Sequence, residues 1–429
     1  MRAAVVGLCA VIGGAGVAAA ADMAAPIEQQ AQAAQRRWMA TGSLDFKYFA
    51  YEGTRGTTAS ASPLGERGKG SQFYMPLALQ LVGAPTDEFK IELMARTGYV
   101  SSRQSTATFS GSYSGSTDTV VSATATYLGW AGIQPYLSLN LNLPTGETVL
   151  RGTSGRARLD PDFVDVPTFG EGFNIGPTIG ANIPIMANLL LNISAGYTRR
   201  GEFKREGQLD AFTGIQGLSS LNPGENYTLS SSLNYSEGAF TGQVTLSYVH
   251  DTATSIDGIR TFRSGNRFSV NSSGTYAFDE NWSTTLTAMF SHGQANFAAN
   301  PALGLPDLAR EQINSNSNLY RIGLEPTYRV NPAFALGPTA SFLYRDRNAY
   351  NALTSQFVPA KTRYTLGGFA NYSVTDTITM TARVERVWTR EDSNPDKFEP
   401  AFNLIVPGSG VERLSFNGWQ VSGGVSARF

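Results

Sequence analysis

The sequence is poor in cysteine, histidine and charge. Its 429 residues include one cysteine and two histidines, and 16% are charged, against about 25% in an ordinary soluble domain. The cysteine, Cys9, lies in the amino-terminal apolar stretch, so the mature chain is expected to contain no disulfide, catalytic thiol or cysteine-bound metal. The net charge of -1 gives no reason to expect nucleic-acid binding.

Long apolar runs are also missing beyond the amino terminus. A helical membrane protein needs stretches of about 20 apolar residues, and residues 22–429 contain none. The chain is instead rich in turn-forming and aromatic residues, with 45 glycines, 24 phenylalanines and 18 tyrosines. This composition suits an all-β protein. A membrane-spanning barrel needs no long apolar run, because only one face of each strand meets lipid.

The amino terminus has the pattern of a secretory signal peptide. Arg2 is followed by an apolar, Ala- and Gly-rich run to residue 19, and a cleavage site follows the alanines. We expect residues 1–21 to be the signal peptide; a membrane anchor is the competing interpretation. Residues 22–40 carry apolar side chains at helical spacing, and we expect them to form a periplasmic or lumenal segment or a mobile leader.

From residue 41 to 429, segments of alternating apolar and polar residues recur, separated in turn by long polar loops and very short turns. Leu137, Leu139 and Leu141, for example, alternate with polar residues at the period of a β-strand. About sixteen such segments, with short turns on one side and long loops on the other, predict a transmembrane antiparallel up-and-down β-barrel. A soluble sandwich would not sort its loops by length, and a propeller would show repeats.

The aromatic residues of these segments favour the membrane barrel further. Tyr48, Trp388 and Trp419 lie near long-loop ends of segments, and Phe89 and Trp282 lie near short-turn ends. Two such groups predict aromatic belts at the two membrane interfaces.

Five residues fit this pattern less well. Proline removes a donor from the strand ladder, so we expect bulges or irregular strands at Pro76, Pro177, Pro326 and Pro338. Arg386 falls on the lipid-facing side in simple alternation, which suggests a bulge or a different start for that strand.

Residues 419–429 alternate without a break and end on the aromatic Phe429. This stretch resembles the carboxy-terminal strand of Gram-negative outer-membrane β-barrels. The resemblance implies that Phe429 and Trp419 serve as an assembly signal. It also implies a location in the Gram-negative outer membrane, with outer-membrane lipid, lipopolysaccharide and the assembly machinery as partners. To close the barrel, this strand must pair with the first one, near residues 44–51. A homo-oligomer is possible.

The polar face of the segments supplies candidate pore-lining residues, and most of them are bases. About sixteen strands would enclose an aqueous lumen. The candidates are Lys47, Lys90, Glu92, Arg96, Arg200, Arg321, Glu325, Arg329, Arg345, Arg347, Arg363, Arg383 and Glu385, joined by Asp45 and Arg428. A wall of this composition would favour anionic or polar solutes. Alternatively, the same side chains form ion pairs that brace a wide barrel.

The loop over residues 144–171 carries opposite charge clusters and is a candidate constriction. The basic cluster is Arg151, Arg156 and Arg158, and the acidic cluster is Asp160, Asp162 and Asp165. Folded inward, they would set up a transverse field across the pore; an outward-facing surface loop is equally compatible with the sequence. The aspartates lack the glycine and glutamate of a calcium loop, so no metal site is expected here. No phosphate-binding loop or metal cluster appears elsewhere in the sequence, so no cofactor is expected either.

Short strand-end motifs bear on the solute. Asn142-Leu143-Pro144-Thr145-Gly146, with Gly176-Pro177-Thr178 and Gly337-Pro338-Thr339, resembles outer-membrane channels of the phenol-degradation MetA family. That resemblance implies uptake of small hydrophobic or aromatic compounds.

An enzyme is disfavoured, because His250-Asp251 has no Gly-x-Ser-x-Gly nucleophile elbow to complete a hydrolase triad. We therefore expect a pore for passive diffusion or uptake of small solutes. The alternative is a non-transporting barrel that acts as an adhesin or surface-structure protein through its long loops.

Overall fold

The computed structural model describes residues 38–392 and 414–429, except 54–67, 107–109, 131, 153, 158, 160–163, 165, 167, 210–215, 301–304 and 351–357. The predicted signal peptide and most of the segment expected over residues 22–40 lie outside the described residues. Residues 38–40 belong to the first strand, because Trp38, Met39 and Ala40 already pair with the second.

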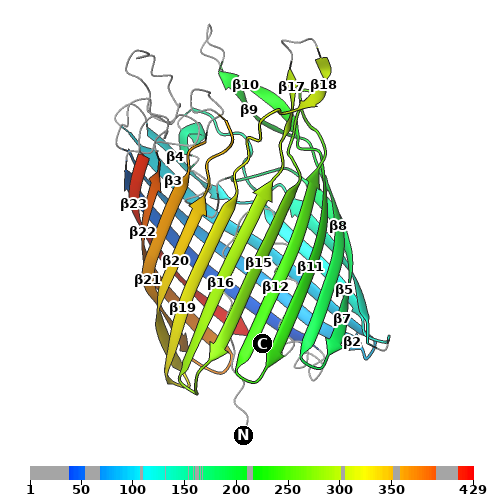
Figure 1. Ribbon diagram of the computed structural model, residues 1–429, viewed down its shortest axis with the longest axis vertical. Helices are drawn as coiled ribbons and strands as arrows, with labels where there is room; N and C mark the ends of the chain where they lie inside the picture. Colours follow the sequence, from blue (N-terminus) through cyan, green and yellow to red (C-terminus); the bar gives the residue numbers. More distant parts are fainter. Residues whose placement is uncertain are drawn as a thin grey trace.

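Sixteen antiparallel strands form one closed barrel, which confirms the predicted fold class (Figure 1). They are β1 (Trp38–Gly53), β2 (Gly68–Thr86), β3 (Phe89–Ser105), β5 (Thr119–Tyr127), β6 (Gln134–Leu143), β7 (Asn174–Met186), β8 (Leu189–Arg200), β11 (Glu225–Glu237), β12 (Phe240–Asp251), β15 (Arg267–Ala277), β16 (Trp282–Gly293), β19 (Leu319–Asn331), β20 (Phe334–Arg345), β21 (Lys361–Ser373), β22 (Ile378–Glu391) and β23 (Leu414–Arg428).

The barrel closes where the sequence requires it, between β1 and β23. The two strands pair from Thr41↔Arg428 to Gly53↔Phe416. Beyond the last of these pairs, the backbones of Ala40 and Phe429 exchange two hydrogen bonds, of 3.1 and 2.8 Å. Closure leaves no strand edge in lipid, where unpaired backbone groups would be costly.

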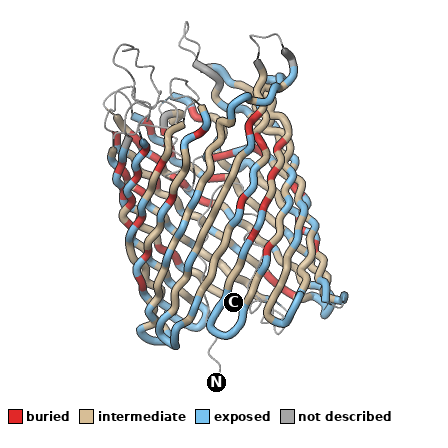
Figure 2. Tube along the Cα trace, in the orientation of Figure 1, coloured by how far each residue is buried: buried red, intermediate tan, exposed pale blue. Residues whose placement is uncertain are grey.

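Register sorts the side chains into two faces, because directly opposed residues of neighbouring strands point to the same side. One face is apolar yet exposed, as at Leu137, Ile179 and Leu229, whose side chains are 56%, 62% and 55% exposed. The other face is polar and more enclosed, as at Ser138 and Ser232, which are 0% and 5% exposed. More and less buried residues follow one another along the strands (Figure 2). The apolar, exposed face is therefore the outer surface of the barrel, and the polar face lines its interior.

Aromatic pairs on the outer face lie near both ends of the barrel. Tyr248 packs on Phe268 near the long loops, with ring centroids 4.9 Å apart, and Trp282 packs on Tyr328 near the short turns, at 4.7 Å. The two predicted belts are therefore present. Among the described residues, no helix has the length and hydropathy of a membrane span.

The bulges expected at the prolines are wrong, but the irregular strands expected there are present. Pairing lapses beside Pro76 between Leu44↔Leu77 and Lys47↔Tyr74, but the register is the same on both sides. Pairing also lapses beside Pro177, between Ile175↔Arg199 and Thr178↔Gly196. It lapses again beside Pro326 and Pro338, between Leu324↔Ala340 and Tyr328↔Leu336, although Pro338 keeps its pairing with Gly368 on the other side. The missing N–H of proline therefore removes a local hydrogen bond, but it does not add the extra residue that defines a bulge. Register shifts occur instead beside short turns, as between Gly83 and Thr86.

The expected irregularity at Arg386 is also wrong. β22 keeps one unbroken register with β21 and with β23, and Arg386 lies on the outer face directly opposite Trp419.

Four of the predicted loops contain strands. Three of them form hairpins, β9 (Phe203–Leu209) with β10 (Gln216–Asn222), β13 (Thr254–Ile256) with β14 (Ile259–Arg263), and β17 (Phe297–Asn300) with β18 (Leu305–Arg310). The hairpins join edge to edge into a six-stranded sheet that rises above one side of the rim (Figure 1). The fourth loop holds β4 (Ser110–Ser116), which extends the barrel sheet beside β3.

Candidate functional site: the inward face and its loop

The predicted pore-lining residues within strands all fall on the inward face by register. They are Lys47, Lys90, Glu92, Arg96, Arg200, Arg321, Glu325, Arg329, Arg345, Arg363, Arg383 and Glu385, with Asp45 and Arg428. Arg347 follows the end of β20 and lies outside the strand ladder. Their role in conduction remains a prediction.

A charged cluster on β19 to β22 centres on Arg383. Its guanidinium donates to both carboxylate oxygens of Glu325, at 2.7 and 3.0 Å, and to Glu385 at 3.2 Å. Glu385 also accepts a hydrogen bond of 2.8 Å from the Thr339 hydroxyl. Gly367 lies between Thr339 and Glu385, and a Cβ there would stand 2.6 Å from the Glu385 Cγ. The absent side chain thus leaves room for the cluster.

A second cluster was only partly predicted. Lys361 is 1% exposed, and its ammonium lies 3.1 Å from a carboxylate oxygen of Glu391. The predicted Arg345 lies 3.7 Å from the same oxygen. Burial of an ammonium requires a paired carboxylate, so the two ends of β21 and β22 are tied together here. Lys361 and Glu391 were missed because the predicted strands stop one residue short of each.

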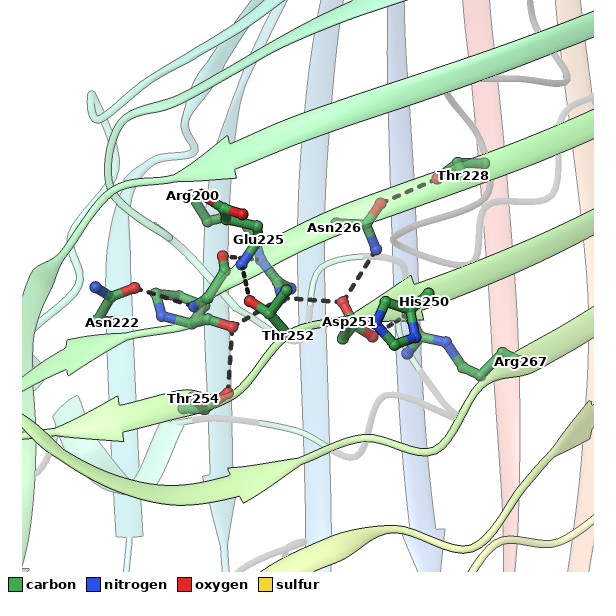
Figure 3. A network of polar contacts seen from close by, with 12 residues as sticks. Arg200, Asn222, Glu225, Asn226, Thr228, His250, Asp251, Thr252, Thr254 and Arg267 are labelled. Carbon is green, nitrogen blue, oxygen red and sulfur yellow. Dashed lines mark hydrogen bonds and ion pairs between the residues drawn. The ribbon is translucent and has the colours of Figure 1, made fainter. Parts of the chain in front are cut away.

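A third cluster surrounds Asp251 at the long-loop end of the wall (Figure 3). Its carboxylate accepts hydrogen bonds from the predicted Arg200 at 2.9 Å, from Arg267 at 3.0 Å and from Asn226 at 3.0 Å. Asp251 is 5% exposed, so the pairing compensates a largely enclosed charge. Asp251 and Arg267 were not among the predicted pore-lining residues. They are the last residue of β12 and the first residue of β15, and both follow the inward-facing alternation of their strands.

His250 points away from this cluster. It lies on the outer face opposite Tyr227, and its Nδ1 lies 2.8 Å from the Asn266 side-chain oxygen. Asp251, the next residue, faces inward. The two side chains therefore stand on opposite faces of the sheet and do not form the dyad of a hydrolase.

The loop of residues 144–171, called the inner loop below, folds into the barrel. Leu159 and Val164 are buried against the inward-facing Phe49, Tyr51 and Val387. Apolar burial of this kind fixes the loop against the wall, since exposing these side chains would cost free energy in proportion to their area.

The inner loop also packs against the wall formed by β2, β3 and β4. Leu150, Ala157 and Phe169 form a buried cluster with Val100 and Tyr113. Two hydrogen bonds from the wall reach the loop backbone: one from the Gln72 amide to the Val166 carbonyl at 2.9 Å, the other from the Ser102 hydroxyl to the Ala157 carbonyl at 2.7 Å. The loop thus lies along the inside of the wall.

Both ends of the inner loop meet at Asp118. Its carboxylate accepts hydrogen bonds from the backbone of Gly146 at 2.9 Å and of Glu171 at 2.8 Å, and from the Asn142 side chain at 2.7 Å. Asn142 in turn donates to the Gly172 carbonyl at 2.7 Å. The Asn142–Gly146 motif therefore has a structural role as the base of the loop. Asp118 was not predicted, and no repeat or spacing in the sequence marks it.

The charges of the inner loop are only partly described. Arg151 is exposed just before the short 3-10 helix at Ser154–Ala157. The side chain of Arg156, together with Arg158, Asp160, Asp162 and Asp165, lies outside the described residues. The transverse field across the pore stays a prediction. In the part of the chain that the structure does describe, no three His, Cys, Asp or Glu side chains are grouped as a metal would require.

The two predicted assembly residues lie on the outer face. Phe429 is 75% exposed and Trp419 is 51% exposed. The guanidinium carbon of Arg386 lies 5.1 Å from the Trp419 ring centroid. Their service as an assembly signal remains a prediction.

A closed barrel of sixteen strands, with an apolar outer face, two aromatic belts and a polar interior, is a transmembrane β-barrel of the bacterial outer-membrane type. The long loops of such barrels are extracellular and the short turns periplasmic, which places the six-stranded sheet outside the cell.

Comparison with known proteins adds distant similarities. No family model matches the sequence, and no curated protein matches it. Similar solved structures include an outer-membrane channel from Pseudomonas putida F1, with 14% identity over 66% of this chain and 95% of that one, at a TM-score of 0.37.

Two further structures cover more of this chain. DcaP, an outer-membrane channel of Acinetobacter baumannii, is 12% identical over 91% of this chain and 97% of its own, with a TM-score of 0.41. OpdK of Pseudomonas aeruginosa, solved with vanillate, is 9% identical over 91% and 99%, with a TM-score of 0.43. Similarities this distant do not assign the chain to any of their families.

Proposed function

We propose that the protein is an outer-membrane channel for passive diffusion of small solutes, with a preference for anionic or polar ones. The observation that carries the proposal is the charge of the inward face. Its bases are Lys47, Lys90, Arg96, Arg200, Arg267, Arg321, Arg329, Arg345, Lys361, Arg363, Arg383 and Arg428, and its acids are Asp45, Glu92, Asp251, Glu325, Glu385 and Glu391. Because the bases outnumber the acids, ion pairing leaves a positive excess.

The ion pairs and the excess charge have separate consequences. Each of the three clusters described above fixes arginine or lysine side chains in place. This is also what we expect if the charged side chains form ion pairs that brace a wide barrel. The remaining positive charge raises the local concentration of anions in a confined aqueous space. Barrels of sixteen strands are wide enough to hold such a space. Bracing and anion preference therefore coexist on one face.

Planar-bilayer recording tests the proposal. The purified barrel should show stepwise conductance, and a KCl gradient should give a reversal potential of the sign expected for anion preference. A folded sample that conducts no ions would refute the channel. Conductance with cation preference would leave the channel standing and refute the proposed role of the basic face.

A second candidate is an adhesin or surface-structure protein, and the six-stranded extracellular sheet favours it. Shortening the hairpins β9–β10, β13–β14 and β17–β18 to tight turns separates the two candidates. Loss of cell-surface adhesion with unchanged conductance would support the adhesin role. Unchanged adhesion would leave the channel as the function.

A further inference from the structure

A hollow of about 1080 Å³ lies on the outside of the barrel, at the long-loop ends of β22, β23 and β1 to β4. We call it the outer hollow. Its lining includes Tyr48, Glu52, Lys69, Arg103 and Trp419. By register all five stand on the outer face, with the exposed apolar side chains, and not on the lumen wall. The lining also includes the inward-facing Tyr51, Gln104 and Phe416, but these side chains are buried, so the charged and aromatic side chains that can meet a ligand are those on the outer face.

Small side chains create the outer hollow. Across the sheet, Trp419 is opposite Ala50, Ala50 is opposite Ser71, and Ser71 is opposite Arg103. One step further along β3, Ser105 is opposite Lys69. Alanine and serine form a low floor, and the larger side chains stand around it. The result is a depression in an otherwise convex outer surface.

The rim of the outer hollow is basic. Lys69, Arg103 and Arg386 contribute three cations, against the single acid Glu52, which stands directly opposite Lys69. Arg386 lies over the Trp419 ring, with 5.1 Å between its guanidinium carbon and the ring centroid. Stacking of this kind engages the face of the guanidinium and leaves its N–H edge able to bind an oxyanion.

The position of the outer hollow selects its ligand. Tyr48 and Trp419 belong to the aromatic belt at the extracellular interface, which marks the level of the lipid headgroups. Cations beside that belt meet the headgroups of the outer leaflet, which in this membrane are phosphorylated sugars. We infer that the outer hollow binds the phosphorylated glucosamine headgroup of lipid A, with Lys69, Arg103 and Arg386 as phosphate ligands.

Native mass spectrometry of the detergent-solubilised barrel with bisphosphorylated lipid A tests the inference. The wild-type barrel should retain bisphosphorylated lipid A. Fully dephosphorylated lipid A should bind to it more weakly. The double variant K69A/R103A should bind lipid A about tenfold or more weakly, because two surface cations are lost. Arg103→Lys should retain binding, since it keeps the charge. Millimolar inorganic phosphate should not displace the lipid.

Arg199→Ala is the matched control. Arg199 is an outward-facing cation near the long-loop end of β8, opposite Glu225, and it does not line the outer hollow. It should bind lipid A as wild type does. The heat-modifiable electrophoretic mobility of a folded barrel verifies that each variant is assembled. Equal binding by wild type and K69A/R103A, or equal binding of phosphorylated and dephosphorylated lipid, would overturn the inference. Displacement by phosphate alone would show a small-anion site instead.

Discussion

Arg383 joins two carboxylates on the inward face of the barrel, those of Glu325 and Glu385. It projects from β22 and reaches Glu325 on β19, so its side chain spans the two strands between them. Its side chain is 19% exposed, and those of Glu325 and Glu385 are 29% and 10% exposed. Removal of one partner from such a group leaves the other charges uncompensated. Arg383 therefore affects both the stability of the wall and its charge.

Arg383→Gln should destabilise the barrel and reduce anion preference. The loss of charge-assisted hydrogen bonds to two carboxylates should cost about 1–3 kcal/mol, seen as a lower transition temperature in heat-modifiable electrophoresis. The two freed carboxylates should shift the reversal potential towards cation preference. Arg390→Gln is the control, because Arg390 lies on the same strand with the opposite orientation. An unchanged reversal potential in R383Q would remove Arg383 from the account of selectivity.

Alternation alone located most of the charged wall. Glu325, Arg383 and Glu385 follow from the period of two and from the choice of the polar face. Lys361 and Glu391 do not, because their strands extend one residue beyond the predicted ends. The ion-pair partners could not be predicted from the sequence. Alternation places Glu325 and Arg383 on the same face, but their contact across two intervening strands depends on the stagger of the barrel.

At the scale of elements, the inner loop combines an apolar attachment with a single polar base. Leu159 and Val164 pack on one part of the wall, and Leu150 and Phe169 pack on another. Asp118 joins the two ends where the loop leaves the wall. Since the loop lies inside the barrel, we propose that its position limits how much of the lumen is open.

Asp118→Ala should loosen the inner loop. The variant loses three hydrogen bonds to a carboxylate, each worth about 1.5–3 kcal/mol, while the apolar contacts stay. In planar bilayers the single-channel current should become larger or noisier than that of wild type. Asp346→Ala is the control, because Asp346 binds Asn318 at 2.7 Å in a different loop. Identical current traces for D118A and wild type would show that the loop does not limit conduction.

The sequence located the inner loop but left its direction open. The sequence does contain an indication of an inward direction, namely the apolar residues Leu150, Leu159, Val164 and Phe169. A loop exposed to solvent rarely carries four large apolar side chains. The strand β13 of the extracellular sheet was missed for a different reason. β13 covers only Thr254–Ile256, and so short a strand has no measurable period.

For the whole molecule, closure between β1 and β23 is the decisive contact. It joins segments from opposite ends of the described chain and leaves each of the sixteen barrel strands with two neighbours. The sequence predicted this pairing because an open edge in lipid is not tolerated. The exact register came only with the structure.

A disulfide tests the register of closure. Ser43 and Ser426 are directly opposed on the inward face, at the Cα separation of about 4.5–5.5 Å that antiparallel partners have. S43C/S426C should therefore oxidise within the assembled barrel and raise its resistance to unfolding in SDS. S43C/S422C, which is offset by four residues, should remain reduced. Equal oxidation of both variants would contradict the observed register.

Phe429→Ala tests the predicted assembly role. Phe429 presents an exposed ring at the periplasmic end of the barrel, and its backbone bonds to Ala40 on the first strand. The substitution keeps the backbone bonds and removes the ring. Membrane levels of the folded protein should fall several-fold, while the conductance of each assembled barrel should be unchanged. Normal membrane levels would contradict an assembly role.

The extracellular sheet has a consequence for how the surface of this protein changes over time. Its hairpins are joined to each other by few residue pairs: Leu221↔Ile256 and Asn222↔Ser255 between the first two, and Phe262↔Ala298 and Arg263↔Phe297 between the second and third. None of these pairs belongs to the barrel ladder. We therefore expect the hairpins to tolerate changes in length and composition while the barrel beneath them keeps its register, so that the outermost surface can change without cost to the membrane-spanning wall.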